Sequence, residues 1–223
     1  MTLLIGAIIL VINLAWIALN RPELLPTAPN DESATVRFPV LLLSSAGAGF
    51  AALLLAWLTE VSETFGFGLI VVATLGTAAA LIDAASRRLP LLLTVALLLE
   101  VAIVVISGAF FGAPSWDGVW GALIGLALFV ALMMAGARGG QIGGGDVVLG
   151  AGLGLWVGAA CASSADPGWS SLQWAGIALL VSLGLGVGFA ADNGIGRNAT
   201  FAFGPALVAG TLGTTVVAYY FVA

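Results

Sequence analysis

The sequence predicts an all-α protein that crosses a membrane about eight times, and its composition and the length of its apolar segments support this fold class. Apolar residues make up 61% of the 223 residues, charged residues make up 8%, and the mean hydropathy is +1.17. An apolar run of about 20 residues crosses about 30 Å of hydrocarbon as a helix. We expect one membrane domain over residues 1–223, with short cytoplasmic loops at 20–37, 84–90 and 137–146.

Each predicted helix is an apolar run that lies between charged or proline-containing intervals. In chain order, we place the eight helices at 3–19, 38–58, 66–83, 91–111, 118–136, 147–165, 171–191 and 201–222. The first run is short enough to be a secretory signal, but Met1 to Leu4 contain no basic residue and Arg21 follows the run. A membrane anchor therefore fits this run better than a cleaved signal peptide.

The basic residues fall only in alternate loops, which predicts the orientation of the chain. All six are arginines, in the first, third, fifth and seventh loops: Arg21, Arg37, Arg87, Arg88, Arg138 and Arg197. The even loops carry acidic residues instead, namely Glu60, Glu63, Asp117 and Asp166. The positive-inside rule places the odd loops in the cytoplasm. We therefore expect a multi-pass protein of the inner (cytoplasmic) membrane with both termini outside.

Composition excludes several kinds of chemistry. The chain has no histidine, and Cys161 is its only cysteine and lies in an apolar run. Catalytic triads that use histidine, cysteine–histidine pairs and histidine-ligated metal sites therefore cannot be built. Without lysine or a basic cluster, nucleic acid is not an expected partner. We expect no metal and no cofactor.

Two aspartates at helix ends are the strongest candidates for chemistry. Asp83 closes the third predicted helix and Asp146 opens the sixth, so the predicted topology brings both to the cytoplasmic face. Carboxylates beside the hydrocarbon are costly and are usually functional. Two close carboxyl groups can share one proton, so that one acts as base and the other as acid toward a water that attacks a peptide carbonyl.

Four short motifs, in order along the chain, resemble those of the type IV prepilin peptidase family, which are GxGD membrane aspartic peptidases. Asp83 is followed seven residues later by Pro90, as in the first aspartate motif of that family. Gly143-Gly144-Gly145-Asp146 is similar to the GxGD motif, Phe203-Gly204-Pro205 to the FGP element, and Arg37-Phe38-Pro39 to the basic-aromatic-proline start of an early helix. The resemblance covers roughly residues 37 to 210.

The resemblance implies an endopeptidase that removes the short, positively charged leader of a prepilin or pseudopilin at the cytoplasmic face, within a type IV pilus or protein secretion system. The implied catalytic residues are Asp83 and Asp146, the implied active-site loop residues are Gly143, Gly144, Gly145 and Pro90, and substrate contact or structural support is implied for Arg87, Arg88, Gly204 and Pro205. Because the loop at 20–37 has no cysteine, the resemblance is to the form that lacks the cysteine-rich insert. We expect no methyltransferase activity.

Three positions depart from the family pattern. The family commonly has asparagine or aspartate where this chain has Leu91, lysine where it has Val148, and glutamate near Leu42. Each difference removes a polar group near the predicted site. We interpret them as changes in substrate positioning or local electrostatics, because both aspartates are retained.

Glycines and one intramembrane glutamate call for separate hypotheses. The cluster at 139–145 lacks the lysine and hydroxyl of a phosphate-binding loop and is interpreted as a hinge that moves the second aspartate. Other glycines at four-residue spacing predict close helix packing: Gly121, Gly125, Gly150, Gly154, Gly158, Gly184 and Gly188. Glu100, inside the fourth predicted helix, is either functional or hydrogen-bonded between helices.

Three other functions stay open at this stage. A proton- or cation-coupled secondary transporter could use both aspartates as ligands, although such sites usually lie near the bilayer midplane. A presenilin-like intramembrane protease shares GxGD, and Pro205-Ala206-Leu207 matches its PAL element, but Ile82 stands before Asp83 where that family has tyrosine. A noncatalytic pilus-assembly protein would have membrane partners without needing either carboxylate.

Overall fold

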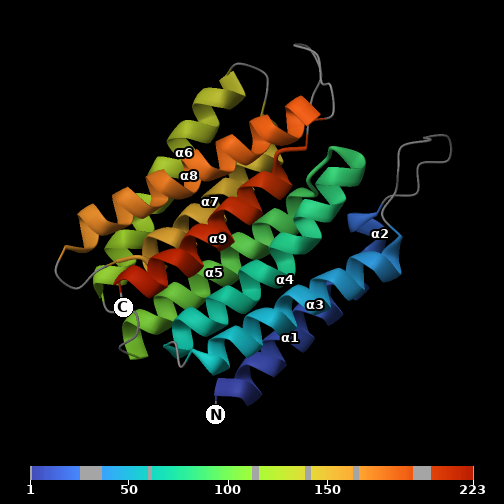
Figure 1. Cartoon of the computed structure of the whole chain (residues 1–223). Coiled ribbons are helices and arrows are strands. Elements are labelled where there is room, and N and C mark those ends of the chain that lie inside the picture. Colours follow the sequence, from blue (N-terminus) through green and yellow to red (C-terminus); the bar gives the residue numbers. More distant parts are fainter. Residues whose placement is uncertain are drawn as a thin grey trace.

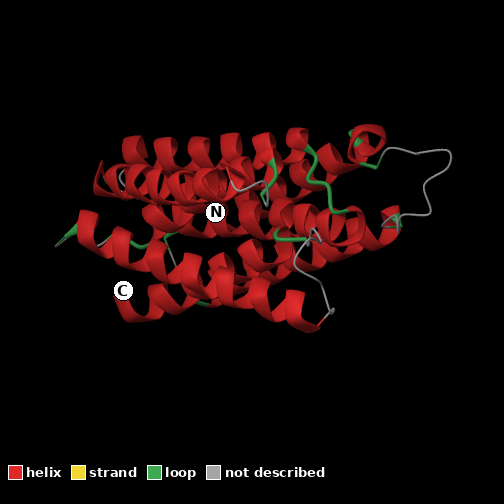
Figure 2. Ribbon diagram, turned by 90° about the horizontal axis from the view of Figure 1, so that it is seen from above, coloured by secondary structure: helices red, strands yellow, loops and turns green. Residues whose placement is uncertain are grey.

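The computed structural model describes residues 2–25, 37–59, 62–111, 116–138, 142–162, 166–192 and 202–222. Within these ranges the chain folds into a bundle of helices that lie roughly along one direction (Figures 1 and 2). In chain order they are α1 (Thr2–Leu19), α2 (Arg21–Leu24), α3 (Phe38–Leu58), α4 (Glu63–Ser86), α5 (Leu91–Phe111), α6 (Trp116–Arg138), α7 (Gly144–Ala160), α8 (Pro167–Asp192) and α9 (Gly204–Val222). The predicted all-α class is therefore confirmed for the described residues.

Helix positions follow the apolar runs closely, with differences at the polar ends. The predicted helices 38–58 and 91–111 agree with α3 and α5 at both ends. The short helix α2 lies within the interval 20–37, where Pro22 stands in its first turn and Leu24 is buried. Proline favours a first helical turn because it has no N–H that needs a partner. The polar interval therefore begins with one turn packed on the bundle.

The number of membrane spans is only partly supported. Five helices, α3, α4, α5, α6 and α8, are long and apolar enough to cross a bilayer, whereas α1, α7 and α9 form shorter apolar helices. Crossing about 30 Å of hydrocarbon needs about 20 helical residues. α7 has 17 residues, because it ends at Ala160 and not at the predicted residue 165. The structure thus supports a multi-pass membrane protein, and the count of eight is not confirmed.

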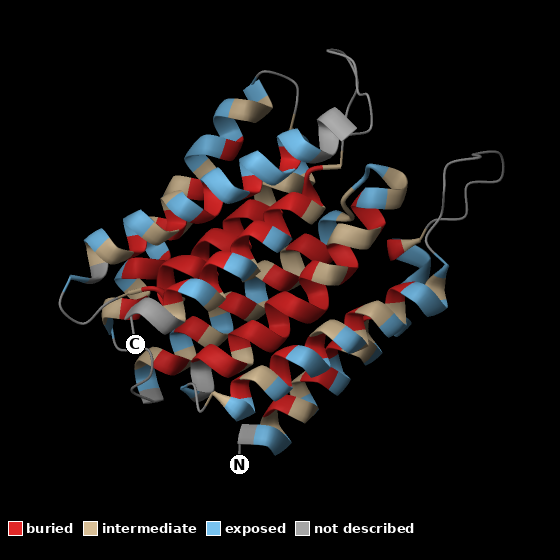
Figure 3. Cartoon of the chain, viewed as in Figure 1, coloured by how far each residue is buried: buried red, intermediate tan, exposed pale blue. Residues whose placement is uncertain are grey.

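Two helices lie at the centre of the bundle. α4 contacts α1, α3, α5 and α9, and α7 contacts α5, α6, α8 and α9. Figure 3 shows buried residues concentrated on these central helices, while α3, α6 and α8 present more exposed residues. We refer to α4, α5, α7 and α9 as the four-helix core. Both predicted aspartates lie on this core.

Glycine allows the most extensive helix contact among the described residues, between α6 and α7. A Cβ atom at Gly125 would overlap the carbonyl oxygen of Gly154, and one at Gly121 would overlap that of Gly158. Backbones can approach this closely only where side chains are absent. The predicted packing role is confirmed for these four glycines. It is wrong for Gly184 and Gly188 on α8, where an added Cβ would meet no described atom within 4 Å.

Candidate active site

Asp83 lies in the last turn of α4 and is almost completely buried, with 4% of its surface exposed. α4 continues to Ser86 and ends at Arg87, whose N–H donates to the carbonyl oxygen of Asp83 at 2.7 Å. The backbone N–H of Gly204 donates to Asp83 Oδ2 at 2.8 Å. A buried carboxylate needs such a donor, because an unpaired charge in a dry site is costly. The bond joins α4 to the start of α9.

Gly204 is suited to this contact for two reasons. It is the first residue of α9, where backbone N–H groups have no partner within the helix and the helix dipole favours a negative charge. A Cβ at this position would also lie only 3.0 Å from Asp83 Oδ2 and 3.3 Å from Asp83 Cβ. Glycine therefore lets the N-terminus of α9 approach the carboxylate directly. The predicted FGP element thus lies against the first aspartate.

Asp146 is held within the first turn of α7, because the helix begins at Gly144, before the predicted residue 147. The backbone N–H of Gly143 donates to Asp146 Oδ2 at 3.0 Å. The other carboxyl oxygen, Oδ1, is buried and has no hydrogen-bond partner among the described residues. A buried carboxyl oxygen without a donor is an unsatisfied acceptor. Asp146 therefore keeps one oxygen available for a donor such as water or a substrate group.

The structure brings the two carboxyl groups together at one end of the bundle, although 62 residues separate them in the sequence. Leu89, six residues after Asp83, packs against Gly145, the residue directly before Asp146. No hydrogen bond joins these two described side chains to each other. Asp83 accepts instead from the backbone N–H of Gly204, and Asp146 accepts from that of Gly143. Two carboxyl groups brought close together in a partly dry site can share one proton.

The contact between Leu89 and Gly145 connects the segments that carry the aspartates. A Cβ at Gly145 would lie 2.7 Å from Leu89 Cβ and 2.9 Å from the Leu89 carbonyl oxygen. The segment between α4 and α5 therefore rests on the first turn of α7. Gly144 has no such neighbour, since an added Cβ would meet no described atom within 4 Å. The close approach of the two segments thus explains Gly145 without a hinge.

The other predicted site residues lie around this contact. The Pro90 carbonyl accepts from the N–H groups of Leu93 and Thr94 at 3.1 and 3.2 Å, so this proline starts α5. Arg87 and Arg88 are exposed, and Pro205 is half-buried. Residues 139–141 of the predicted glycine hinge lie outside the described residues.

The positions that depart from the family pattern remain apolar in the folded chain. Leu91 is exposed at the first residue of α5, directly after Pro90, and Val148 is half-buried one turn from the start of α7. Leu42 is half-buried and packs against the hydrophobic core from α3. At these three positions the chain carries leucine or valine where the family commonly has a polar side chain. Asp83 and Asp146 therefore rely on backbone donors for the hydrogen bonds that the structure shows.

Glu100 has a structural partner away from the aspartates. In the orientation of the Asn13 amide that satisfies its hydrogen bonds, its nitrogen donates to Glu100 Oε2 and Oε1 at 2.8 and 3.0 Å. Asn13 is fully buried on α1, and Glu100 lies in the middle of α5. The hydrogen bond supports the interhelical interpretation of Glu100. Asn13 is a polar residue within the first predicted apolar run, and this was the sequence signal that could have identified the pair.

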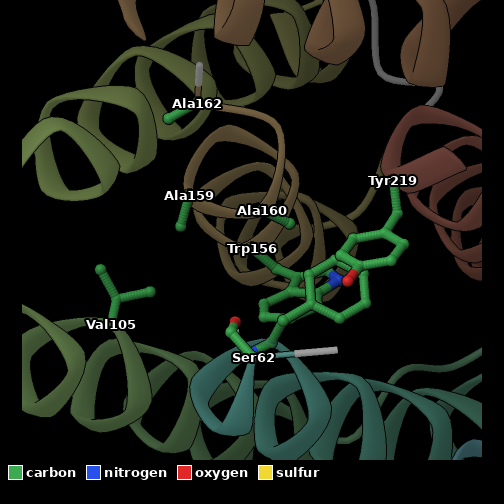
Figure 4. A pocket seen from close by; sticks show the side chains of 8 residues that line it. Ser62, Val105, Trp156, Ala159, Ala160, Ala162 and Tyr219 are labelled. Carbon is green, nitrogen blue, oxygen red and sulfur yellow. Dashed lines mark hydrogen bonds between the residues drawn. The ribbon is translucent and has the colours of Figure 1, made fainter. Parts of the chain in front are cut away.

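The opposite end of the four-helix core contains a cavity of about 170 Å³ (Figure 4). Its walls come from the start of α4, the end of α7 and the later parts of α5 and α9, and they are formed by Ser62, Phe65, Val105, Trp156, Ala159, Ala160, Ala162 and Tyr219. The Phe65 ring lies 5.2 Å from that of Trp156 and 4.8 Å from that of Tyr219, between centroids. None of the described residues that line this cavity carries a carboxyl group.

Two carboxyl groups that can hold one proton can take a proton from a water and give one to a leaving group. Among the described residues, no three acidic or sulfur-bearing side chains gather into a group that could hold a metal ion.

Comparison with known proteins gives one finding. A family model described as the type IV leader peptidase family matches residues 69–218, which include both aspartates, Gly204 and the whole four-helix core except its ends. Neither the curated proteins nor the solved structures give a significant match.

Proposed function

Because this chain belongs to the type IV leader peptidase family, we propose that it is a membrane aspartic endopeptidase that cleaves the N-terminal leader from prepilin-like proteins. Asp83 and Asp146 are the proposed catalytic residues. The observation that carries the proposal is their position at one end of the four-helix core, in the last turn of α4 and the first turn of α7, where Leu89 packs against Gly145.

The proposed reaction is hydrolysis of one peptide bond by an activated water. One carboxylate accepts a proton from the water while the water oxygen forms a bond to the carbonyl carbon of the peptide. The other, protonated carboxyl group donates its proton to the amide nitrogen as the carbon–nitrogen bond breaks. The products are a free carboxyl group on the leader and a free amine on the mature protein. The buried, unpartnered Oδ1 of Asp146 fits a water-binding role.

The proposed location follows from the distribution of arginines. We assign the end of the core with the aspartates to the cytoplasmic face of the inner membrane, because Arg87, Arg88 and Arg138 all lie at that end. α1 begins and α9 ends at the opposite end of the bundle (Figure 1). This arrangement fits both termini outside and eight crossings, with α1, α7 and α9 as short spans. A membrane-embedded prepilin helix could then reach the carboxyl groups from the bilayer.

The test is co-expression with candidate prepilin-like proteins from the same genome. Wild type, Asp83→Asn and Asp146→Asn are compared, and leader removal is followed by the mass of the substrate. We expect cleavage by wild type and its loss in both variants, because an amide cannot take a proton from water. Asp117→Asn, a change of the same kind in the first turn of α6, is the control and should cleave normally.

Two outcomes would contradict the proposal. Cleavage that persists in Asp83→Asn and in Asp146→Asn would contradict the two-carboxylate mechanism. Pilin assembly that depends on the protein, with uncut leaders in every strain, would instead favour a noncatalytic assembly role.

A further inference from the structure

The turn that follows Asp83 holds two exposed arginines in a fixed arrangement. Arg87 has a φ of 52° and is the one non-glycine residue with positive φ among those described. Its N–H donates to the Asp83 carbonyl oxygen at 2.7 Å. Ser86 Oγ donates to the carbonyl oxygens of Ile82 and Arg88 at 2.7 and 3.2 Å. Left-handed backbone is uncommon and costly for an arginine, and such residues cluster at functional sites.

The same turn connects the segments that carry the two carboxyl groups. Arg87 stands one helical turn beyond Asp83, and Leu89, two residues later, rests on Gly145 beside Asp146. The side chains of Arg87 and Arg88 are exposed and form no ion pair with a described residue. Both guanidinium groups are therefore available beside the candidate site.

Their position relative to the bundle indicates which part of a substrate they meet. Asp83 is buried in the last turn of α4, whereas Arg87 and Arg88 lie beyond the end of that helix. A substrate whose apolar helix lies in the bilayer would place its leader outside the bundle, on the side of these arginines. Guanidinium groups bind carboxylates through paired, charge-assisted hydrogen bonds and repel cations.

We infer that Arg87 and Arg88 select substrates with an acidic side chain in the last few leader residues before the cleaved bond. The inference rests on the proposed function and adds the substrate class. It adds an acidic position to the short, positively charged leader that the family resemblance implies, since a lysine at this point would meet two guanidinium groups. Arg87 and Arg88 act as specificity residues, with no part in proton transfer.

The first test measures binding without cleavage. Two labelled prepilin peptides keep the same residue directly before the cleaved bond and differ only in glutamate or lysine at the two positions that precede it. Their binding to the Asp83→Asn, Asp146→Asn double variant is measured in detergent. We expect the glutamate peptide to bind about two- to fivefold tighter for each exposed ion pair that forms. This preference should shrink at high salt.

Matched variants separate charge from backbone conformation. In the same background, Arg87→Gly keeps the left-handed turn and removes the guanidinium, and Arg88→Gln removes the second charge. Both should lower the preference for the glutamate peptide, while Arg87→Lys should retain much of it. Arg138→Gln, an exposed arginine at the end of α6, is the control and should leave the preference unchanged.

The result that overturns the inference is a glutamate-to-lysine ratio that Arg87→Gly and Arg88→Gln leave unchanged, or equal weakening of both peptides. The second test repeats the comparison as cleavage by enzyme with both aspartates intact. Selective binding of the glutamate peptide without cleavage of either peptide would overturn the proposed function and support the assignment of the arginines. Cleavage of both peptides at the same rate would support the proposed function and overturn the assignment of the arginines.

Discussion

The two ends of the four-helix core use the same helices for opposite kinds of packing. At one end, glycines let backbone N–H groups and a neighbouring loop reach the segments that carry Asp83 and Asp146. At the other end, aromatic rings from α4, α7 and α9 surround a cavity whose described lining residues are all without carboxyl groups. The comparison shows that the carboxyl groups are held by backbone groups that approach at glycines, whereas the aromatic side chains at the other end pack around a cavity.

This contrast predicts which substitutions affect the proposed cleavage and which affect only stability. Small additions at the carboxylate end should impair cleavage in a folded protein, because they displace charged groups. Truncation of large side chains at the aromatic end should lower the free energy of unfolding without changing cleavage by the molecules that remain folded.

The largest effect on cleavage is expected from Gly204→Ala. The added methyl group would lie 3.0 Å from Asp83 Oδ2, so the carboxylate or the start of α9 must move. The shift is a few tenths of an ångström at the carboxyl group itself. Because a misplacement of about 1 Å can cost about 100-fold in rate, we expect a loss of more than about tenfold. Cleavage kinetics on a prepilin-like substrate provide the measurement. Gly213→Ala, on the same helix with no described atom within 4 Å of the added Cβ, should cleave like wild type. Equal rates for both variants would contradict the positioning role of Gly204.

A smaller loss, about tenfold in rate, is expected from Gly145→Ala. The new Cβ would overlap both the side chain and the carbonyl group of Leu89, so the turn after Asp83 must shift relative to Asp146. Adding Leu89→Ala should restore part of the activity, because it shortens one of the two overlapping groups. Gly144→Ala provides the control, since the space around it is open. If Gly144→Ala impaired cleavage as much as Gly145→Ala, a hinge would explain the glycines better than close packing.

At the aromatic end, Phe65→Ala should lower the free energy of unfolding by about 3 kcal/mol, as expected for loss of a buried ring. Phe65 is 8% exposed and lies between Trp156 and Tyr219. The 18 residues from Phe65 to Asp83 correspond to about 27 Å of helix, so cleavage per folded molecule should not change. Denaturant unfolding in mixed micelles measures the loss. Phe110→Ala, at a side chain 74% exposed on α5, should cost much less, and a similar cost would contradict this account.

The smallest effect is expected between the two ends, at the hydrogen bonds from Asn13 to Glu100. Asn13→Leu or Glu100→Leu should each lower the free energy of unfolding by about 1 kcal/mol, a usual size for a hydrogen bond between membrane helices. The double variant should lose less than the sum of the two, since no polar group is then left without its partner. Strict additivity in this double-mutant cycle would show that the two side chains do not interact. Cleavage should be unchanged in all three variants.

Much of the fold could be predicted because a bilayer imposes simple rules on a sequence. Apolar runs placed α3 and α5 at the correct residues, and polar ends marked the last turn of α4 and the first turn of α7. The packing of Gly121 and Gly125 on α7 followed from four-residue spacing. The same spacing at Gly184 and Gly188 led to a wrong prediction, because spacing defines a helix face and cannot tell whether a neighbour covers it.

The contacts that hold the candidate site were harder to predict. The donor to Asp83 is the backbone N–H of Gly204, and every residue except proline has such a group, so the sequence letter does not reveal it. The contact between Leu89 and Gly145 depends on how two distant helix ends meet. Side-chain chemistry thus identified the two aspartates, whereas the groups around them depend on tertiary structure.

The two aspartates belong to different halves of the chain, since α1 to α5 carry Asp83 and α6 to α9 carry Asp146 together with Gly204. A gene divided between α5 and α6 would therefore yield two polypeptides, each with an incomplete centre. Leader removal by the co-expressed pair would then report that the fragments had found each other within the bilayer. Cleavage by the divided enzyme would thus serve as an assay for the assembly of its two fragments in a membrane.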